Sequence, residues 1–193
     1  MRGMKYYDRS SGLTVILDKM GKKEVALSAV DERHAKGRLI IPNTMKVKGE
    51  VYKITSIEKN VLRNRKQLKE VVIGKYVKNI GSSAFYGCDK LQSVTMGKKV
   101  TTIGKNAFYK CKKLKKITIP SGVCKIDKNA FYGCKNLKNI TIQSKKLTSK
   151  NVGSNAFKGI YSKAVIKVPK SKLAAYNKML KIRGVGAKVK IKR

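Results

Sequence analysis

Apolar residues recur at a constant spacing through the middle of the chain. An isoleucine, a phenylalanine, a cysteine and a leucine each return with a period of 23, so that segments 79–97, 102–120 and 125–143 superpose without gaps. The recurring positions are Ile80, Ile103 and Ile126; Phe85, Phe108 and Phe131; Cys88, Cys111 and Cys134; and Leu91, Leu114 and Leu137. A degenerate copy precedes them at 57–73, and a later copy at 156–169 is displaced by a few positions. This pattern is typical of a repeat protein of about five coils.

Each repeat predicts two extended runs that are separated by turns. Ile117 and Ile119 alternate with Thr118, which is the period of a strand with one buried side. A shorter run at 100–103 precedes a helical-looking turn at 106–111. One repeat cannot bury its own apolar side, so neighbouring repeats must stack, with equivalent side chains in columns about 4.8 Å apart. The pattern therefore predicts a β-rich repeat solenoid with Ile, Leu, Phe and Cys columns as its core.

The two ends of the chain lack the repeat. Short strand-like runs near the N-terminus are followed by an alternating segment around Lys48-Gly49, which predicts a hairpin. Near the C-terminus we expect a helix that Ser171 caps and Gly184 ends, followed by an edge strand. That helix could instead lie on a membrane surface. The expected organisation is a β-rich N-terminal cap at 1–53, the solenoid at 54–169, and a C-terminal cap of helix and strand at 170–193.

With these residues in view, the chain resembles the BspA-type leucine-rich-repeat proteins of bacterial surfaces. Their unit is similar to I-G-x-x-A-F-x-G-C-x-x-L-x-x-I-x-I-P, which is matched here by 80–97, 103–120 and 126–142. Toward the ends, Arg65 and Ile160 stand where the unit has cysteine. The resemblance implies a right-handed leucine-rich-repeat solenoid with a parallel sheet on its concave side. It also implies an adhesion or interaction function, outside the cell or at its surface, and no catalysis.

Charge changes the picture of the surface. The chain has 47 Lys and Arg residues against 10 Asp and Glu residues, a formal net charge of +37, and beyond Asp89 its one acid is Asp127. Such a surface attracts polyanions such as cell-wall polymer, sulfated glycan, anionic lipid or nucleic acid. The alternative is a solvated lysine fringe that keeps an elongated protein soluble. Only 8 of the bases are Arg, the residue suited to bidentate phosphate recognition, and this favours the fringe, with weak polyanion affinity as a by-product.

Side chains suited to catalysis or metal binding are scarce. His34 is the one histidine, no phosphate-binding loop motif occurs, and the cysteines are not arranged in C-x-x-C pairs. We therefore expect no enzyme, no cofactor and no metal. Stacked Cys88, Cys111 and Cys134 would lie farther apart than a disulfide prefers, so we expect buried, reduced thiols that act as small hydrophobes. Cys124 lies off this column and is expected to be accessible.

The candidate binding residues lie on the outward side of the predicted sheet. One row is expected to hold Val72, Thr95, Thr118, Thr141 and Lys167, and the adjacent row Glu70, Ser93, Lys116, Asn139 and Val165. A third row, at the turn after each phenylalanine, holds Tyr86, Tyr109 and Tyr132. These tyrosines either shield the edge of the core or form an aromatic contact strip for a glycan or a protein.

Two function hypotheses remain at this stage. The leading one is a non-enzymatic adhesion module that binds a protein, such as host extracellular matrix or another cell's surface, through the sheet. The alternative is a lysine-driven binder of anionic polymer, a cell-wall polymer or a sulfated glycan, with nucleic acid as the less favoured form of this alternative. No apolar run is long enough for a membrane helix, so no membrane insertion is expected. The basic segment 1–10 has no apolar stretch after it, so no secretory leader is expected within this chain.

Overall fold

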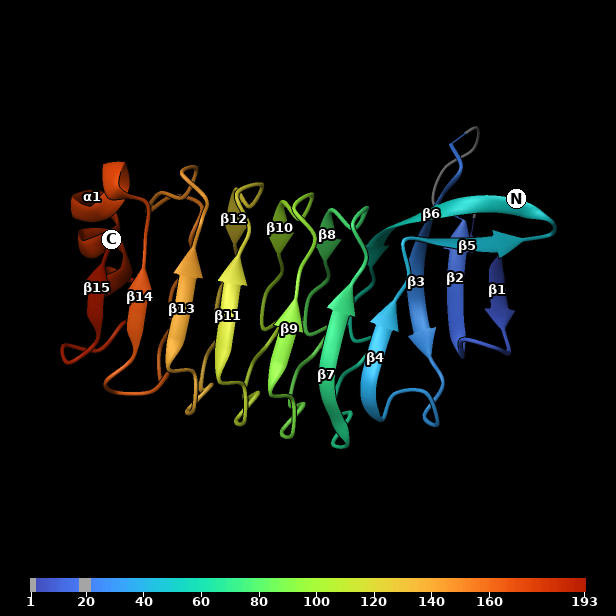
Figure 1. The fold of residues 1–193 in the computed structure, drawn as a ribbon, viewed down its shortest axis with the longest axis horizontal. Helices are drawn as coiled ribbons and strands as arrows, with labels where there is room; N and C mark the ends of the chain where they lie inside the picture. The colour runs from blue at the N-terminus through green and yellow to red at the C-terminus, as the bar shows by residue number, and fades with distance from the viewer. Residues whose placement is uncertain (1–2, 18–21) are drawn as a thin grey trace.

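The computed structural model describes residues 3–17 and 22–193 as a row of coils that stack from the N-terminal to the C-terminal end (Figure 1). Two sheets run along this row. The sheet nearer the viewer in Figure 1, here the front sheet, contains in spatial order β4 (Gly37–Ile41), β7 (Leu68–Ile73), β9 (Ser93–Thr95), β11 (Lys116–Ile119), β13 (Asn139–Ile142), β14 (Val165–Lys167) and β15 (Lys190–Lys192). The rear sheet contains β1 (Lys5–Asp8), β2 (Leu13–Leu17), β3 (Glu24–Val30), β6 (Glu50–Ile57), β8 (Asn79–Ile80), β10 (Thr102–Ile103) and β12 (Lys125–Ile126), with β5 (Thr44–Val47) paired to β6.

The repeat of the sequence becomes the register of the sheets. Neighbouring strands of the front sheet are all parallel, and Ile117 of β11 pairs with Ile140 of β13, the equivalent residue of the next repeat. Parallel pairing follows because each coil returns to the same sheet in the same direction. The strand that the sequence predicts from Ile117 to Ile119 is confirmed, with both isoleucines buried and Thr118 exposed.

The predicted core columns are confirmed. The rings of Phe85, Phe108 and Phe131 stack with centroids 5.0 and 5.3 Å apart, and Phe157 continues the column at 5.4 Å. All four side chains are buried, together with the Cys and Leu columns beside them. Burial contributes about 1.5–3 kcal/mol for each large apolar side chain, so every added coil increases the stability of its neighbours.

The segment between the two strands of a coil is a chain of turns, and the turn expected at 106–111 is confirmed but does not have helical geometry throughout. Asn106 and Lys110 have positive φ values of 55° and 54°, which a right-handed helix does not permit. Hydrogen bonds run instead to the next coil, as from the Phe108 N–H to the Ala130 carbonyl at 2.8 Å. The turns therefore stack as a ladder of their own.

The C-terminal end is held by a loop that interrupts the repeat. The step from Phe131 to Phe157 is longer than the regular period, and the extra residues allow 144–151 to bulge toward α1 (Leu173–Ile182). The buried Tyr176 hydroxyl accepts a hydrogen bond from the Leu147 N–H at 3.1 Å and donates one to the Ser144 carbonyl at 2.9 Å. This contact ties the helix to the solenoid.

The helix boundaries correct one prediction and confirm another. Ser171 does not cap α1; it lies within the 3₁₀ turn η1 (Lys170–Lys172) that follows Pro169, and Lys172 stands at the N-cap without a side-chain bond. Gly184, with φ of 96°, follows the last turn as expected, and the Val185 N–H bonds the Leu180 carbonyl at 3.1 Å. No helix among the described residues is long and apolar enough to cross a membrane.

The sheets extend into the N-terminal segment for which a cap is expected. The β5–β6 hairpin forms around Lys48 and Gly49, both with positive φ, as predicted. Upstream of it, β3 pairs in parallel with β6, and β4 pairs in parallel with β7. The solenoid therefore has about six turns, one more than the count from the sequence, because 24–41 adds a strand to each sheet without repeating the motif.

Candidate functional site

The outward residues of the front sheet form the two rows expected from the sequence. Thr118 pairs with Thr141, and Thr141 with Lys167; Val72 pairs with Thr95, and the register of β9 against β11 sets Thr95 beside Thr118. The adjacent row runs Glu70, Ser93, Lys116, Asn139 and Val165. The structure extends these rows to Ile40 and Arg38 of β4 and to Lys192 and Lys190 of β15. The arrangement of the candidate residues is thus confirmed, while their role in binding stays a prediction.

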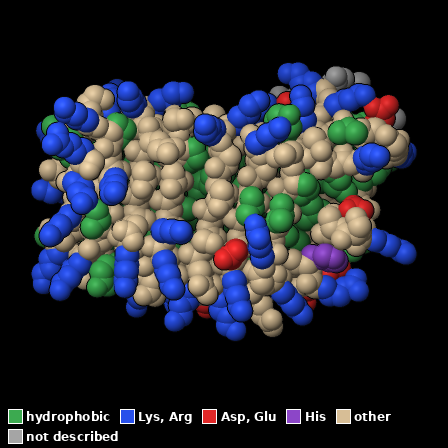
Figure 2. All heavy atoms as spheres, in the orientation of Figure 1, with side chains coloured by type: hydrophobic (Ala, Val, Ile, Leu, Met, Phe, Trp, Pro, Cys, Tyr) green, Lys and Arg blue, Asp and Glu red, His purple; other side chains and the backbone are tan. Residues whose placement is uncertain are grey.

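Charge is distributed unevenly over this face. The first row is uncharged from Ile40 through Thr141 and carries lysine only at its C-terminal end, at Lys167 and Lys192. In the second row Arg38 forms an ion pair with Glu70 at 4.0 Å. Figure 2 shows Lys and Arg mainly along the margins and at the C-terminal end, with only a few charged side chains in the central area between them. The middle of the front face is therefore a shallow surface with few charged side chains, and lysines and arginines surround it.

An apolar hollow lies at the N-terminal end of the same face. It has a volume of about 470 Å³ and is formed where β4, β7 and β9 end. Ile40, Val72 and Met96 line it together with Pro42 and the backbone of the adjoining turns, and Lys75 stands at its rim. Ile40 is 55% exposed, which is unusual for a side chain of its size. Figure 2 shows exposed hydrophobic atoms gathered toward this end.

The three candidate tyrosines form a stacked column. The rings of Tyr86 and Tyr109 lie 4.8 Å apart, those of Tyr109 and Tyr132 5.0 Å apart, and the planes differ by 5° and 6°. The Arg63 guanidinium lies over Tyr86 with its carbon 4.4 Å from the ring centroid. Neighbouring rings thus cover each other's faces. A sugar stacks on a free ring face, so this arrangement favours the interpretation that the tyrosines shield the core edge over the interpretation that they bind a glycan.

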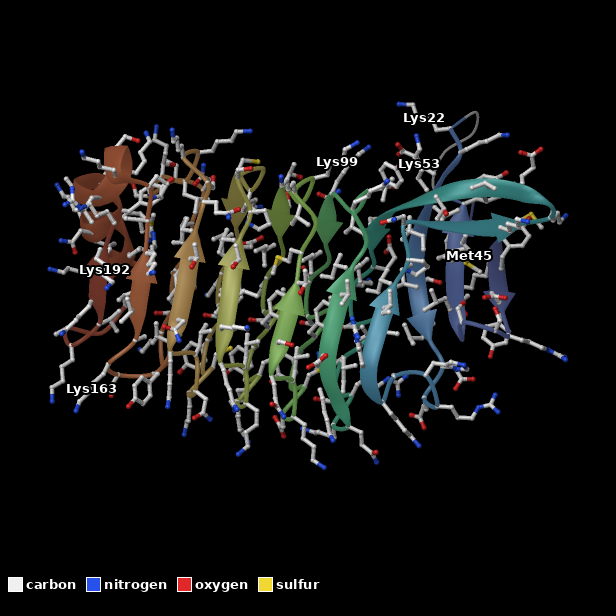
Figure 3. All side chains as sticks on the ribbon, viewed as in Figure 1. Lys22, Met45, Lys53, Lys99, Lys163 and Lys192 are labelled. Carbon is white, nitrogen blue, oxygen red and sulfur yellow. The ribbon has the colours of Figure 1, made fainter. Side chains whose placement is uncertain are left out.

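A further column, with one tyrosine and two lysines, was not predicted from the sequence. Tyr76 lies between Lys53 of the preceding coil and Lys99 of the following coil, whose ammonium nitrogens are 5.2 and 5.1 Å from its ring centroid. The Lys75 ammonium is also 5.1 Å from this ring. Figure 3 labels Lys53 and Lys99 at the upper margin of the molecule. The spacing could have revealed the column, because positions 53, 76 and 99 follow the same period as the core columns.

The cysteine column is buried and reduced, as predicted, but it is not purely hydrophobic. The thiols of Cys111 and Cys134 donate hydrogen bonds of 3.1 Å to the carbonyls of Phe85 and Phe108 in the preceding coil. Burial raises the pKa of Cys134 to about 12 and that of Cys111 well above its usual value. Buried thiols with raised pKa values are poor nucleophiles. Cys124 is exposed, as expected.

Little else among the described residues suggests chemistry. His34 lies in the turn after β3, with its Nδ1 3.8 Å from a carboxylate oxygen of Asp31. The hydrogen bond from the Arg33 side chain lowers the pKa of Asp31 to about 2, so this acid is already occupied. Within the described ranges, no three His, Cys, Asp or Glu side chains lie close enough to hold a metal ion. The front face is therefore the leading candidate for a functional surface.

Known proteins share this architecture. A leucine-rich repeat protein from Bacteroides capillosus is 26% identical, with a TM-score of 0.56 over 62% of this chain and 84% of that one. A leucine rich cell surface protein from Faecalibacterium prausnitzii is 22% identical, with a TM-score of 0.56 over 86% of this chain and 54% of that one. The pneumococcal vaccine antigen PcpA is 15% identical, with a TM-score of 0.65 over 89% and 51%. The chain thus spans about half the length of the latter two proteins.

No curated protein matches the sequence. The family described as "BspA type Leucine rich repeat region" matches residues 55–180 in six copies. This match covers more than half of the chain and agrees with the coils, whose Ile, Phe, Cys and Leu columns are the repeated positions of the motif. The chain belongs to the BspA-type leucine-rich-repeat family.

Proposed function

We propose that the protein is a non-enzymatic adhesion or interaction module of a bacterial cell-surface or secreted protein and that it binds a protein partner through the front face. The observation that carries this proposal is the row of uncharged outward side chains from Ile40 to Thr141, on a chain of net charge +37. The centres of protein interfaces are depleted in charged residues, whereas a fringe that served solubility alone would also cover this row. Family membership supports the interaction role and the location.

The binding residues would come from the middle and C-terminal strands. Threonine and asparagine offer hydrogen bonds from a rigid sheet, and two lysines add positive charge, one on the middle strand β11 and one on β14. We propose that these contacts are made by Thr95, Thr118, Thr141, Asn139, Lys116 and Lys167, with Tyr86, Tyr109 and Tyr132 at the margin. The partner would be a host extracellular-matrix protein or a protein on another cell.

A pair of front-face substitutions tests this proposal against a matched pair on the rear sheet. Thr118→Arg with Thr141→Arg places bulk and positive charge at the centre of the front face. Asn79→Arg with Thr102→Arg adds the same groups to two paired outward positions of the rear sheet. Binding would be measured by surface plasmon resonance on a set of purified extracellular-matrix proteins, at about 0.15 M and about 1 M salt, where the Debye length is ~8 and ~3 Å.

The proposal expects binding that persists at high salt, is lost in the front-face pair and is unchanged in the rear-sheet pair. Equal effects of the two pairs would contradict it, as would the absence of binding to every matrix protein in the set.

A second function has one observation in its favour. Beyond residue 90 the described structure contains two ion pairs of lysine with an acid, Lys112–Asp89 and Lys125–Asp127, so that most lysines of this part face solvent with their charge uncompensated. Such a surface suits cell-wall polymer or sulfated glycan. A steep fall of heparin affinity with salt, equal in both arginine pairs, would favour this charge-led binding.

A further inference from the structure

The apolar hollow of the front face adjoins the lysines around Tyr76, which lie at the upper margin, where Lys53 comes from β6 of the rear sheet (Figure 3). The two features together are here called the corner. Lys75 belongs to both features, because it lines the rim of the hollow and places its ammonium 5.1 Å from the Tyr76 ring centroid. Its backbone N–H is fixed by a 2.8 Å hydrogen bond to the side-chain oxygen of Asn43, which also lines the hollow. The corner is therefore a continuous surface that changes from aliphatic to cationic over one residue.

The hollow replaces polar positions of the rows with aliphatic ones. Ile40 and Val72 occupy the row that continues as Thr95, Thr118 and Thr141. Ile40 is exposed and Val72 is half-buried, and neither belongs to the buried core. Exposed aliphatic side chains in a concave surface with a polar rim are typical of an interaction site.

The lysine cluster concentrates positive charge, and none of its three ammonium groups is in ion-pair contact with an acid among the described residues. The ammonium nitrogens of Lys53, Lys75 and Lys99 lie 5.2, 5.1 and 5.1 Å from the centroid of the Tyr76 ring. Within the described part of the chain, no carboxylate lies within 4.0 Å of these three ammonium groups. Glu24 is the strand partner of Lys53, but its carboxylate bonds the Lys78 ammonium at 3.1 Å instead. An anion placed among the three lysines would relieve their mutual repulsion.

We propose that this corner binds an acidic protein segment, which inserts one large apolar side chain into the hollow at Ile40, Val72 and Met96 and sets flanking carboxylates against Lys53, Lys75 and Lys99. The inference rests on the proposed function and narrows it to a partner chemistry. A peptide is favoured over a sulfated glycan because a glycan offers no aliphatic group to fill the hollow. Lysine, a flexible point charge, suits carboxylates on a mobile segment.

Three labelled peptides of one length test the proposal on the whole chain by fluorescence anisotropy. The first has a central Leu-Phe pair flanked by three Asp on each side. The second replaces Leu-Phe with Gly-Ser, and the third replaces every Asp with Asn. The first peptide is expected to bind about tenfold or more tightly than either of the others, because each loses one of the two contacts. Heparin fragments form a fourth probe.

Variants place the binding at the corner. Ile40→Ser and the triple variant Lys53→Gln, Lys75→Gln, Lys99→Gln should each weaken the first peptide about tenfold. The matched controls are Ile182→Ser, at an isoleucine 60% exposed on α1, and the triple variant Lys163→Gln, Lys188→Gln, Lys190→Gln at the opposite end. The controls should leave the affinity within about twofold of the wild type.

The outcomes separate this inference from the proposed function. Equal affinity for the first two peptides would overturn the inference, and so would an equal loss of peptide affinity in the two lysine triple variants. The inference would also fail if the corner variants weakened heparin binding but left peptide binding unchanged. If the Thr118→Arg and Thr141→Arg pair still abolished binding to a matrix protein in that case, the proposed function would stand without it. Conversely, the corner variants could weaken peptide binding while the Thr118→Arg and Thr141→Arg pair left binding to matrix proteins unchanged. The inference would then hold and the proposed function would fail.

Discussion

The regular coils and the N-terminal corner are built on the same two sheets, yet their surfaces differ. Between 80 and 142 the outward row repeats threonine and the inward columns repeat Ile, Phe, Cys and Leu. At the corner the outward row holds Ile40 and Val72, and a tyrosine stands between two lysines. This difference teaches that strict repetition produces a stable core and a uniform surface. A distinct candidate binding surface forms where the residue type changes along a row of equivalent positions.

The largest effect expected of a single substitution distinguishes an inward column from the corner. Phe108→Ala should lower the free energy of unfolding by about 3–5 kcal/mol, because it leaves a cavity between two stacked rings. Tyr76→Ala should cost only about 1 kcal/mol, because it removes cation–π contacts at a half-exposed position. Urea unfolding followed by circular dichroism measures both, with Phe108→Leu as the conservative control. Equal costs at the two positions would show that the corner is part of the core.

Alkaline pH should test the cysteine column next. Burial raises the pKa of Cys88 and Cys134 from 9.0 to about 12 and that of Cys111 also upward. In the unfolded chain these thiols lose their protons above pH 9, whereas the folded chain keeps them. The contribution of these thiols to the free energy of unfolding is therefore complete below about pH 9. It falls as pH rises toward 12, by about 1.4 kcal/mol per pH unit for each thiol.

Substitution identifies the source of that alkaline loss. The triple variant Cys88→Ser, Cys111→Ser, Cys134→Ser should have a flatter stability profile between about pH 9 and 11 than the wild type, whatever its stability at pH 7. The exposed Cys124→Ser serves as control and should keep the wild-type slope. Parallel profiles for all three proteins would argue against buried, protonated thiols.

A smaller effect is expected where the repeat is interrupted for structural reasons. Tyr176→Phe leaves the Leu147 N–H and the Ser144 carbonyl without their partner in a buried site, which should cost about 1–3 kcal/mol. Hydrogen exchange should show the loss as faster opening of 144–151 and α1 before the central coils. Unchanged protection there would mean that the loop does not hold the helix.

The smallest effect is expected at the corner itself. Ile40→Thr continues the threonine row and should change the free energy of unfolding by no more than about 0.5 kcal/mol, because the side chain points outward. The same substitution should weaken the acidic Leu-Phe peptide. A large loss of stability would show that Ile40 serves folding and would remove the contrast between the corner and the coils.

Much of the central solenoid follows from the sequence, and the ends follow less well. The Phe column, the sheet rows and the Lys48-Gly49 hairpin could be predicted because each depends on a local pattern or on the regular repeat spacing. The cap of the C-terminal helix could not, because Pro169 starts a 3₁₀ turn that carries the chain past Ser171 before the helix begins.

The sequence by itself determined which side chains point inward and which coils are neighbours. Stacked coils copy the period, so any two residues that are separated by one full period are brought together by translation alone. The tertiary structure decided the contacts that break this rule. Ile40 meets Val72 at a separation outside the period, because a hairpin and a register shift intervene. The hollow depends on that contact and became visible only in the folded chain, whereas the Lys53, Tyr76 and Lys99 column beside it keeps the regular period.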